Sequence, residues 1–334
     1  MINLCVLALW LDPVGGIQSA LDPAGPQAAR IERLWWLMFW VTLVVFVLVI
    51  GTLSISIARR RRSQPIPFPP KDKLPAEKPI GRVIAAAIAL TIITLFVLLV
   101  ASVVAGKNQH QSLASTNPVS IQVIGHQWWW EVRYTSPQAD QTIITANEIH
   151  VPVGVPININ TSSRDVIHSF WAPNVNGKRD LIPGYSTAFW FQADTARIYR
   201  GQCAEFCGLQ HAHMSFYLVA ETPQQFEQWK QQQLKSAPEP DTETKKRGQG
   251  VFLSNACVMC HTIRGTIAGS RVGPDLTHVA SRQAIAAGTL PNTRGNIAGW
   301  IVDPQHIKPG VRMPPNPLSP DDLNALLDYM ETLK

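Results

Sequence analysis

The chain has 334 residues, enough for two or three domains, and 46% of them are hydrophobic. Its formal net charge of +6 is concentrated at 58–82, where eight Lys or Arg stand against two Asp or Glu. Nucleic-acid binding would require a basic face on a folded domain with aromatic residues among the charges, so this pattern argues against it. Four of the five cysteines form close pairs, 203/207 and 257/260, which argues against a disulfide framework.

Residues 1–30 form an N-terminal segment. The run 2–11 is apolar and short, as in the core of a signal peptide. No basic residue precedes this run and no clear small-x-small cleavage site follows it, so cleavage and retention both stay open. Cys5 lacks the small residues that would precede a lipoprotein attachment site, which argues against a lipid anchor there.

Residues 31–105 are predicted to form a transmembrane hairpin. Its apolar runs, 35–57 and 83–104, contain no charged residue, and each can cross the ~30 Å hydrocarbon core of a bilayer. Two buried core helices are the alternative, which the flanking arginines fit poorly. The basic loop 58–82 is predicted to be cytoplasmic, because positive charge accumulates in cytoplasmic loops. Both ends of the hairpin would then face the periplasmic or extracellular side of a bacterial cell membrane.

From residue 106 to 235 the pattern changes to short β-rich runs separated by Pro, Gly and Asn. This pattern predicts a small Greek-key β-barrel or sandwich. A polar helix is predicted to close the domain over 223–235. The β-rich runs are 119–124, 143–144, 155–159, 186–191 and 216–219.

Residues 236–244 contain two prolines and scattered acids and are predicted to be a linker. The remaining residues, 245–334, contain residue types that typically begin and end helices, and they are predicted to form an all-α domain. Its last helix is expected to begin after Ser319, because serine caps helix N-termini and Pro320 suits the first helical position.

The motif Cys257-Val-Met-Cys-His261 has the C-x-x-C-H pattern of a c-type haem attachment site. Cys257 and Cys260 would form the thioethers, and His261 would bind the iron. A methionine thioether is the usual partner of such a histidine in electron-transfer haems. Met313 follows a turn and is the best placed of the six methionines. A zinc or redox C-x-x-C with a chance histidine is the alternative.

A second set of ligands lies upstream of the haem motif. Cys203, Cys207, His211 and Met214 follow one another at spacings of four, four and three, and His168 precedes them in a β-type context. Two thiols, two imidazoles and a thioether form a soft set that favours copper, and the second cysteine would let two thiolates bridge two ions. Zinc is the alternative, but its cysteines usually follow C-x-x-C spacing. The other histidines, expected to be structural or at the surface, are His110, His126, His150, His213, His278 and His306.

The stretch 125–230 resembles subunit II of haem–copper cytochrome c oxidases. The two-span hairpin and a C-terminal segment similar to class I cytochrome c match the caa-type variant, so the resemblance covers nearly the whole chain. It implies a cupredoxin-like Greek-key β-barrel over 106–235 and a class I cytochrome c domain over 245–334. The motifs that carry the resemblance are Gly125-His-Gln-Trp-Trp-Trp130, Asp165-Val-Ile-His168-Ser-Phe-Trp171, Ile182-Pro-Gly184 and Gly201-Gln-Cys-Ala-Glu-Phe-Cys-Gly208 with His211 and Met214.

The resemblance also implies a binuclear copper centre, CuA, with two bridging cysteines, one histidine for each ion and two weak outer ligands. These ligands are, in that order, Cys203 and Cys207, His168 and His211, and Met214 with the backbone carbonyl of Glu205. The carboxylate of Glu205 would also bind a magnesium ion at the border with subunit I.

Three further residues take their meaning from the resemblance. Trp128 matches the aromatic residue through which electrons enter the copper centre, whereas Trp129 and Trp130 are expected to pack in the core. The carbonyl of Pro274 would accept the imidazole N–H of the haem histidine, as in class I cytochromes c. The family usually carries an acid near the start of the second span, and Glu77 is the nearest one here.

These features predict the electron-entry subunit of a terminal respiratory oxidase, in which subunit I reduces O2 to water with proton translocation. Electrons would pass from an upstream cytochrome c or quinol–cytochrome c reductase to the haem, then to CuA and subunit I, with subunit III as a further partner. The alternatives are a CuA-containing nitric oxide reductase small subunit and a membrane-tethered copper or electron carrier that docks with no oxidase. Quinol oxidase subunits lack the CuA ligands present here, which argues against that class.

Overall fold

The computed structural model describes residues 17–62, 78–110 and 118–334. The apolar run 2–11 with Cys5, and Glu77 in the proline-rich loop, lie outside these residues, so what was predicted for them stays a prediction. The chain folds as two compact units, one of residues 29–112 and one of the remaining residues, and each is described by itself.

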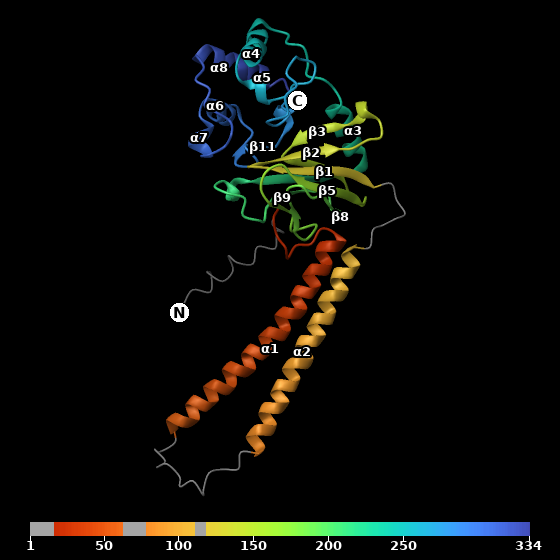
Figure 1. Cartoon of the computed structure of the whole chain (residues 1–334), viewed down its shortest axis with the longest axis vertical. Coiled ribbons are helices and arrows are strands. Elements are labelled where there is room, and N and C mark those ends of the chain that lie inside the picture. Colours follow the sequence, from red (N-terminus) through yellow and green to blue (C-terminus); the bar gives the residue numbers. More distant parts are fainter. Residues whose placement is uncertain (1–16, 63–77, 111–117) are drawn as a thin grey trace, which may run out of the picture. The chain divides into compact units, whose positions relative to one another are not determined.

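The smaller unit consists of two long helices, α1 (Pro26–Arg62) and α2 (Lys78–His110), shown in Figure 1. Their most apolar stretches have mean hydropathies of 2.6 and 3.0, and no part of either stretch is buried. Both helices are long and apolar enough to cross a membrane, where lipid would cover the exposed apolar side chains. This exposure argues against two buried core helices.

The larger unit begins with a β-rich domain of two five-stranded sheets. The first sheet has the strand order β3-β2-β1-β5-β8 and the second has the order β4-β10-β9-β6-β7. Strands β1 and β5 pair in parallel, as do β4 and β10, among otherwise antiparallel neighbours. The bounds are β1 (Val119–His126), β2 (Trp129–Tyr134), β3 (Ile143–Ala146), β4 (Glu148–Pro152), β5 (Ile157–Ser163), β6 (His168–Trp171), β7 (Arg179–Leu181), β8 (Thr187–Phe191), β9 (Arg197–Cys203) and β10 (Ser215–Glu221).

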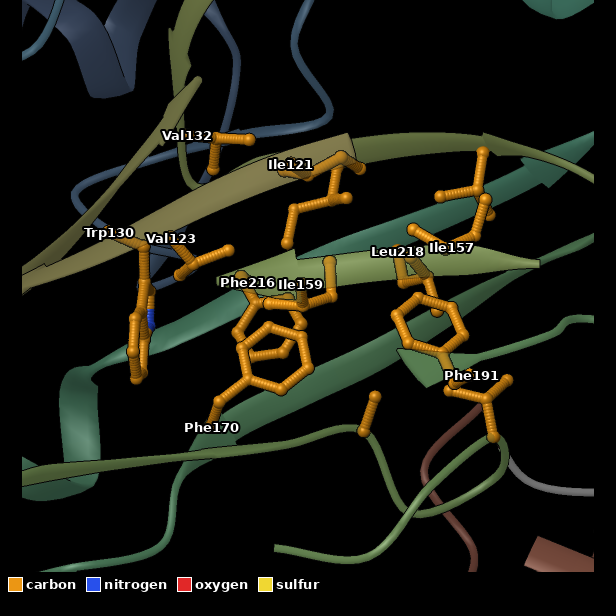
Figure 2. Close-up of a cluster of buried hydrophobic side chains, with 14 of the residues drawn as sticks. Ile121, Val123, Trp130, Val132, Ile157, Ile159, Phe170, Phe191, Phe216 and Leu218 are labelled. Carbon is orange, nitrogen blue, oxygen red and sulfur yellow. The ribbon is translucent and has the colours of Figure 1, made fainter. Parts of the chain in front are cut away.

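The core of this domain lies between the two sheets. Figure 2 shows Ile159 of β5 beside the rings of Phe170 of β6 and Phe216 of β10, with Ile157 of β5 near Leu218 of β10, and all five side chains are fully buried. The rings of Phe170 and Phe216 stack with their centroids 4.5 Å apart. The inward-facing side chains of the two sheets therefore form one apolar layer between them.

A segment ahead of α1 forms part of this domain, which the sequence did not indicate. The N–H of Ala24 donates to Asn174 O at 2.6 Å, and the N–H of Asp194 donates to Ala24 O at 2.7 Å. The N–H of Arg200 donates to Ile17 O at 2.7 Å. These backbone hydrogen bonds attach residues 17–24 to the strand-bearing region.

Helix α3 (Pro223–Gln233) ends the β-rich domain, as predicted. Thr222 caps it, because its hydroxyl accepts from the N–H of Gln225 while the Gln225 side chain accepts from the N–H of Thr222. The first residue after the helix, Leu234, packs against the core of the β-rich domain. Farther along, the N–H of Ala237 donates to Arg264 O at 2.9 Å, so the predicted linker is attached to the C-terminal domain at its start.

The C-terminal domain is helical around a second core and carries one short pair of strands. The predicted last helix is confirmed, with Ser319 as N-cap and Pro320 as its first residue. Two membrane-length helices, a cupredoxin-like β domain and an all-α domain together confirm the predicted fold class. The elements are α4 (Glu243–Ser254), α5 (Cys257–Cys260), β11 (Ala284–Ile285), β12 (Leu290–Pro291), α6 (Arg294–Val302), α7 (Pro304–Ile307) and α8 (Pro320–Met330).

Gly248 lies where α4 crosses α8 and leaves no room for a side chain. A Cβ at this position would lie 2.0 Å from Ala325 O and 2.6 Å from Ala325 C, both backbone atoms. Gly248→Ala is therefore expected to lower the free energy of unfolding by about 1–3 kcal/mol, as overpacking does. Denaturant unfolding of the full chain measures this change.

Gly250, on the same helix, supplies the matched control. It is exposed, and a Cβ there would meet nothing within 4 Å. Gly250→Ala is expected to raise the free energy of unfolding by about 0.5–1 kcal/mol, because alanine loses less backbone entropy than glycine in a helix. Equal effects of the two substitutions would contradict the close crossing at Gly248.

Candidate functional site

The turn between β9 and β10 carries four of the predicted metal ligands. Cys203 ends β9, and residues 204–214 lead back to the start of β10. The N–H of Cys203 donates to Met214 O at 2.8 Å, which closes the turn. Strand β6 pairs with β9, with Phe170 opposite Cys203, and this register brings His168 beside the turn.

The donor atoms of these residues approach one another closely. Cys203 Sγ lies 3.7 Å from Cys207 Sγ. His168 Nδ1 is 3.9 Å from Cys203 Sγ, and His211 Nδ1 is 3.6 Å from Cys207 Sγ. Met214 Sδ is 3.8 Å from Cys207 Sγ. The set is soft and, apart from His211, buried, so its chemistry fits copper better than a hard cation.

The imidazole of His168 is held from both sides. Its Nε2 is 2.8 Å from Asp165 Oδ1, which leaves Nδ1 facing Cys203. A Cβ at Gly125 would lie 2.7 Å from the ring, so only glycine permits this packing. Burial lowers the pKa of His168, but the Asp165 carboxylate and the Cys203 sulfur together outweigh it and raise that pKa above its ordinary value. Asp165, which also accepts from the N–H of Gln127 at 2.7 Å, is thus an orienting residue that the sequence analysis did not assign.

The two thiols differ in acidity. Contact with Cys207 lowers the pKa of Cys203 to about 3, against the effect of burial. The same contact raises the pKa of Cys207, because one proton is retained between two adjacent sulfurs. The lowered pKa of Cys203 favours its thiolate, which is the form that ligates metals.

We expect Asp165→Ala to weaken copper binding by about 10–100-fold, because it removes the carboxylate that fixes the His168 ring. Competition with a copper chelator measures the affinity of the full chain. Asp180→Ala is the control, since Asp180 lies two strands from the turn on β7 and is exposed. Unchanged affinity in Asp165→Ala would show that packing against Gly125 alone orients the ring.

Two other predicted features of the turn can be placed. The carbonyl of Glu205 lies 3.2 Å from Cys203 Sγ, while the Glu205 carboxylate belongs to an exposed residue. Its role toward magnesium stays a prediction. His213, the nearest rival to His211, is instead hydrogen-bonded through Nδ1 to Gln210 Oε1 at 2.8 Å.

The predicted haem ligands line one cavity of the C-terminal domain. Cys257, Cys260, His261, Pro274 and Met313 all face it. Two thiols, an imidazole and a thioether around an apolar cavity fit a covalently attached haem. The apolar wall includes Phe252, Leu276, Ile297, Trp300, Leu326 and Met330.

His261, the predicted iron ligand, is held by the segment around Pro274. His261 Nδ1 is 2.7 Å from Pro274 O, which leaves Nε2 for iron. A Cβ at Gly273 would lie 2.7 Å from His261 Cε1, so the backbone passes against the ring. Burial lowers the pKa of His261, which favours the neutral form that binds metal.

Met313 is held by Gln305, a residue that the sequence analysis did not single out. Gln305 Nε2 donates to Val311 O and to Met313 O, both at 2.8 Å. Its Oε1 accepts from the N–H of Gly310 at 2.9 Å. One amide side chain therefore fixes the loop that carries the predicted axial ligand.

The haem cavity reaches the β-rich domain. His126, Gln127, Trp128 and Trp129, at the end of β1 and the start of β2, line the same cavity as the haem ligands. Trp128 is buried, and its Nε1 donates to Cys207 O at 2.9 Å. Trp128 therefore lines the haem cavity and is also hydrogen-bonded to the backbone of a predicted copper ligand.

Of the two tryptophans that follow Trp128 in the sequence, one lies in the core and the other lines the haem cavity. Trp130 is fully buried against Phe170 and Phe216, as expected for a core residue. The expectation that Trp129 packs in the core is wrong: its ring stacks on His126 with centroids 4.3 Å apart, and it lines the haem cavity. It alternates with Trp130 along β2 and so points away from the core.

Comparisons with known proteins agree with both halves of the site. A family model described as cytochrome C oxidase subunit II, periplasmic domain, matches residues 136–221, and one described as cytochrome c matches residues 245–334. The chain is 34% identical to a cytochrome c oxidase subunit 2 of Alkalihalophilus pseudofirmus, over 99% of this chain and 96% of that protein. It is 28% identical to a protein of the same name from Bacillus subtilis, over 95% of this chain and 92% of that protein.

The two matched domains imply copper and haem as cofactors, which agrees with the soft ligand set and the apolar cavity. The paired membrane-length helices agree with a membrane protein that carries a soluble part. The relatives are subunits of haem–copper oxidases, and the fused cytochrome c domain is the mark of the caa-type. The chain belongs to the cytochrome c oxidase subunit 2 family.

Proposed function

We propose that this subunit admits electrons to the oxidase through a covalent c-type haem and a binuclear CuA centre, which lead on to subunit I. When bound, the haem and the copper ions supply the one-electron chemistry. The observation that carries the proposal is the position of Trp128, which lines the haem cavity and donates through its indole N–H to the carbonyl of Cys207.

At the copper centre, the protein supplies a preformed and largely buried ligand set. In this assignment Cys203 and Cys207 would be the shared thiolate ligands of the two ions, and His168 and His211 would each bind one ion. Their sulfur and nitrogen atoms already lie within 3.6–3.9 Å of one another in pairs, which supports this assignment. Met214 and the carbonyl of Glu205 act as weak outer ligands, which tune the potential more than they hold the metal.

In the cytochrome domain, the thiols of Cys257 and Cys260 would attach the porphyrin, and His261 and Met313 would bind the iron. Pro274 sets the orientation of the imidazole through its carbonyl. Thioether ligation raises the reduction potential, which suits a carrier near the oxidising end of a respiratory chain. The apolar cavity wall excludes water from the iron.

Orientation and partners follow from the same proposal. The basic loop between α1 and α2 is cytoplasmic, and both soluble domains lie on the periplasmic or extracellular side. Subunits I and III are the membrane partners, and a cytochrome c or quinol–cytochrome c reductase is the donor. The exposed carboxylate of Glu205 binds magnesium at the border with subunit I.

Metal analysis and electron paramagnetic resonance of the purified full chain test this function. The expected result is one haem and two copper ions per chain, with hyperfine splitting from an electron shared by two copper nuclei. A single copper ion with the splitting of one nucleus, or zinc in its place, would contradict the binuclear centre. That result would favour the tethered carrier instead.

A further inference from the structure

The cytochrome domain contacts the copper-binding domain through two loops, one after β11 and one after α7. In the first loop, Ala287 O accepts hydrogen bonds from both the N–H and the hydroxyl of Ser215, each at 3.0 Å. In the second loop, Pro309 O accepts from Gln210 Nε2 at 2.7 Å. Ser215 and Gln210 border the copper-binding turn, so the cytochrome domain packs directly against that turn.

Lys308 joins both loops to the copper-binding domain. Its Nζ donates to Trp128 O at 2.9 Å and to Ala286 O at 3.0 Å. Only 1% of its surface is exposed. Lys308 also begins the loop that leads to Met313, the predicted axial ligand. Its side chain therefore connects this loop with Trp128.

A buried lysine of this kind is costly for the fold. Transfer of an ammonium group out of water carries a large penalty unless a carboxylate compensates it. In the part of the chain that the structure describes, Lys308 forms no salt bridge, and both of its partners are backbone carbonyls. Burial lowers its pKa to about 7, and the amine can donate to two carbonyls in either protonation state.

We propose that Lys308 is a positioning residue that fastens the cytochrome domain to the Trp128 carbonyl, so that electrons cross from the haem cavity to the copper turn in one fixed geometry. A methionine of similar length would fill the space without the cost of burying an amine. The two directed hydrogen bonds are what the lysine adds. This inference rests on the proposed function and names the residue that sets the distance between its two centres.

The test uses the full chain loaded with haem and copper. A light-activated ruthenium complex reduces the haem, and the absorbance of haem and copper then follows the intramolecular step. Lys308→Met is expected to slow this step by about tenfold, because it removes the hydrogen bond to Trp128 O, the one of the two that crosses between the domains, and so lowers the docked population. The rate should also fall with solvent viscosity, because the domains must now find each other before each transfer.

Lys246→Met is the matched control, since Lys246 lies on α4 with 57% of its side chain exposed. It should leave the rate and its viscosity dependence unchanged. Absence of haem-to-copper transfer in the unmodified chain would overturn the proposed function itself. Normal transfer there and an equal, viscosity-independent rate in Lys308→Met would overturn only the role of Lys308. If Lys308→Met does not fold, an unchanged rate in Lys308→Leu, which also lacks a donor, has the same meaning.

Discussion

Cys207→Ser is expected to abolish the binuclear copper signal while the haem spectrum stays unchanged. Cys207 Sγ is the atom on which the ligand set converges, at 3.7 Å from Cys203 Sγ, 3.6 Å from His211 Nδ1 and 3.8 Å from Met214 Sδ. A serine hydroxyl is a hard donor that keeps its proton at neutral pH, so it cannot replace a bridging thiolate for copper. The haem cavity uses none of these side chains, so its absorption should not change.

Electron paramagnetic resonance and copper analysis of the full chain give the readout. His213→Asn is the control, because His213 lies in the same turn but is bonded to Gln210. It should keep two copper ions and the shared-electron hyperfine pattern. A binuclear signal that survives in Cys207→Ser would mean that this sulfur is not a bridge.

The strands predicted from the sequence are those whose apolar pattern is clear enough to be recognised without knowing which strand pairs with them. The five predicted runs overlap β1, β3, β5, β8 and β10, although two of them begin one or two residues before the strand does. Strands β2, β4, β6, β7 and β9 were not predicted; β7 and β9 are rich in polar or charged residues, and β7 is only three residues long. Pairing with neighbours specifies such strands, and pairing is not visible in local hydrophobicity.

The ligand positions could be predicted because metals and haem require particular residue types at particular spacings. Cys257-Val-Met-Cys-His261 specifies its chemistry locally, and the turn from Cys203 to Met214 nearly does so. His168 lies 35 residues before Cys203 in the sequence, and the pairing of β6 with β9 is what brings it to the turn.

Apart from Pro274, the residues that orient these ligands could not be predicted. Gln305 and Lys308 are a common glutamine and a common lysine in the sequence, and only the folded loop shows that they bind backbone carbonyls. Every residue has a backbone carbonyl, so the residue types in the sequence do not show which carbonyl a side chain binds. Trp129 was misassigned for a related reason, since the direction of one side chain depends on where β2 begins.

Met313→Ala is expected to convert the haem from low-spin to high-spin and to lower its reduction potential. Removal of the thioether leaves the sixth position to water, a weak ligand, and thioether ligation is what raises the potential of such haems. The loop itself should persist, because Gln305 holds it through the backbone carbonyls of residues 311 and 313. Absorption spectra, carbon monoxide binding to the reduced form and a potentiometric titration measure the change, and the copper signal should be unaffected.

Met330 provides the comparison for this prediction, because it is a second methionine that lines the haem cavity, and it is 6% exposed. It belongs to α8, where it packs in the hydrophobic core of the domain. Met330→Leu conserves that packing and should leave a low-spin haem, since volume-conserving swaps are tolerated in cores. A low-spin spectrum in Met313→Ala, together with a high-spin spectrum in Met330→Leu, would assign the axial ligand to α8. The loop held by Gln305 would then serve the contact of Lys308 with Trp128 and not the iron.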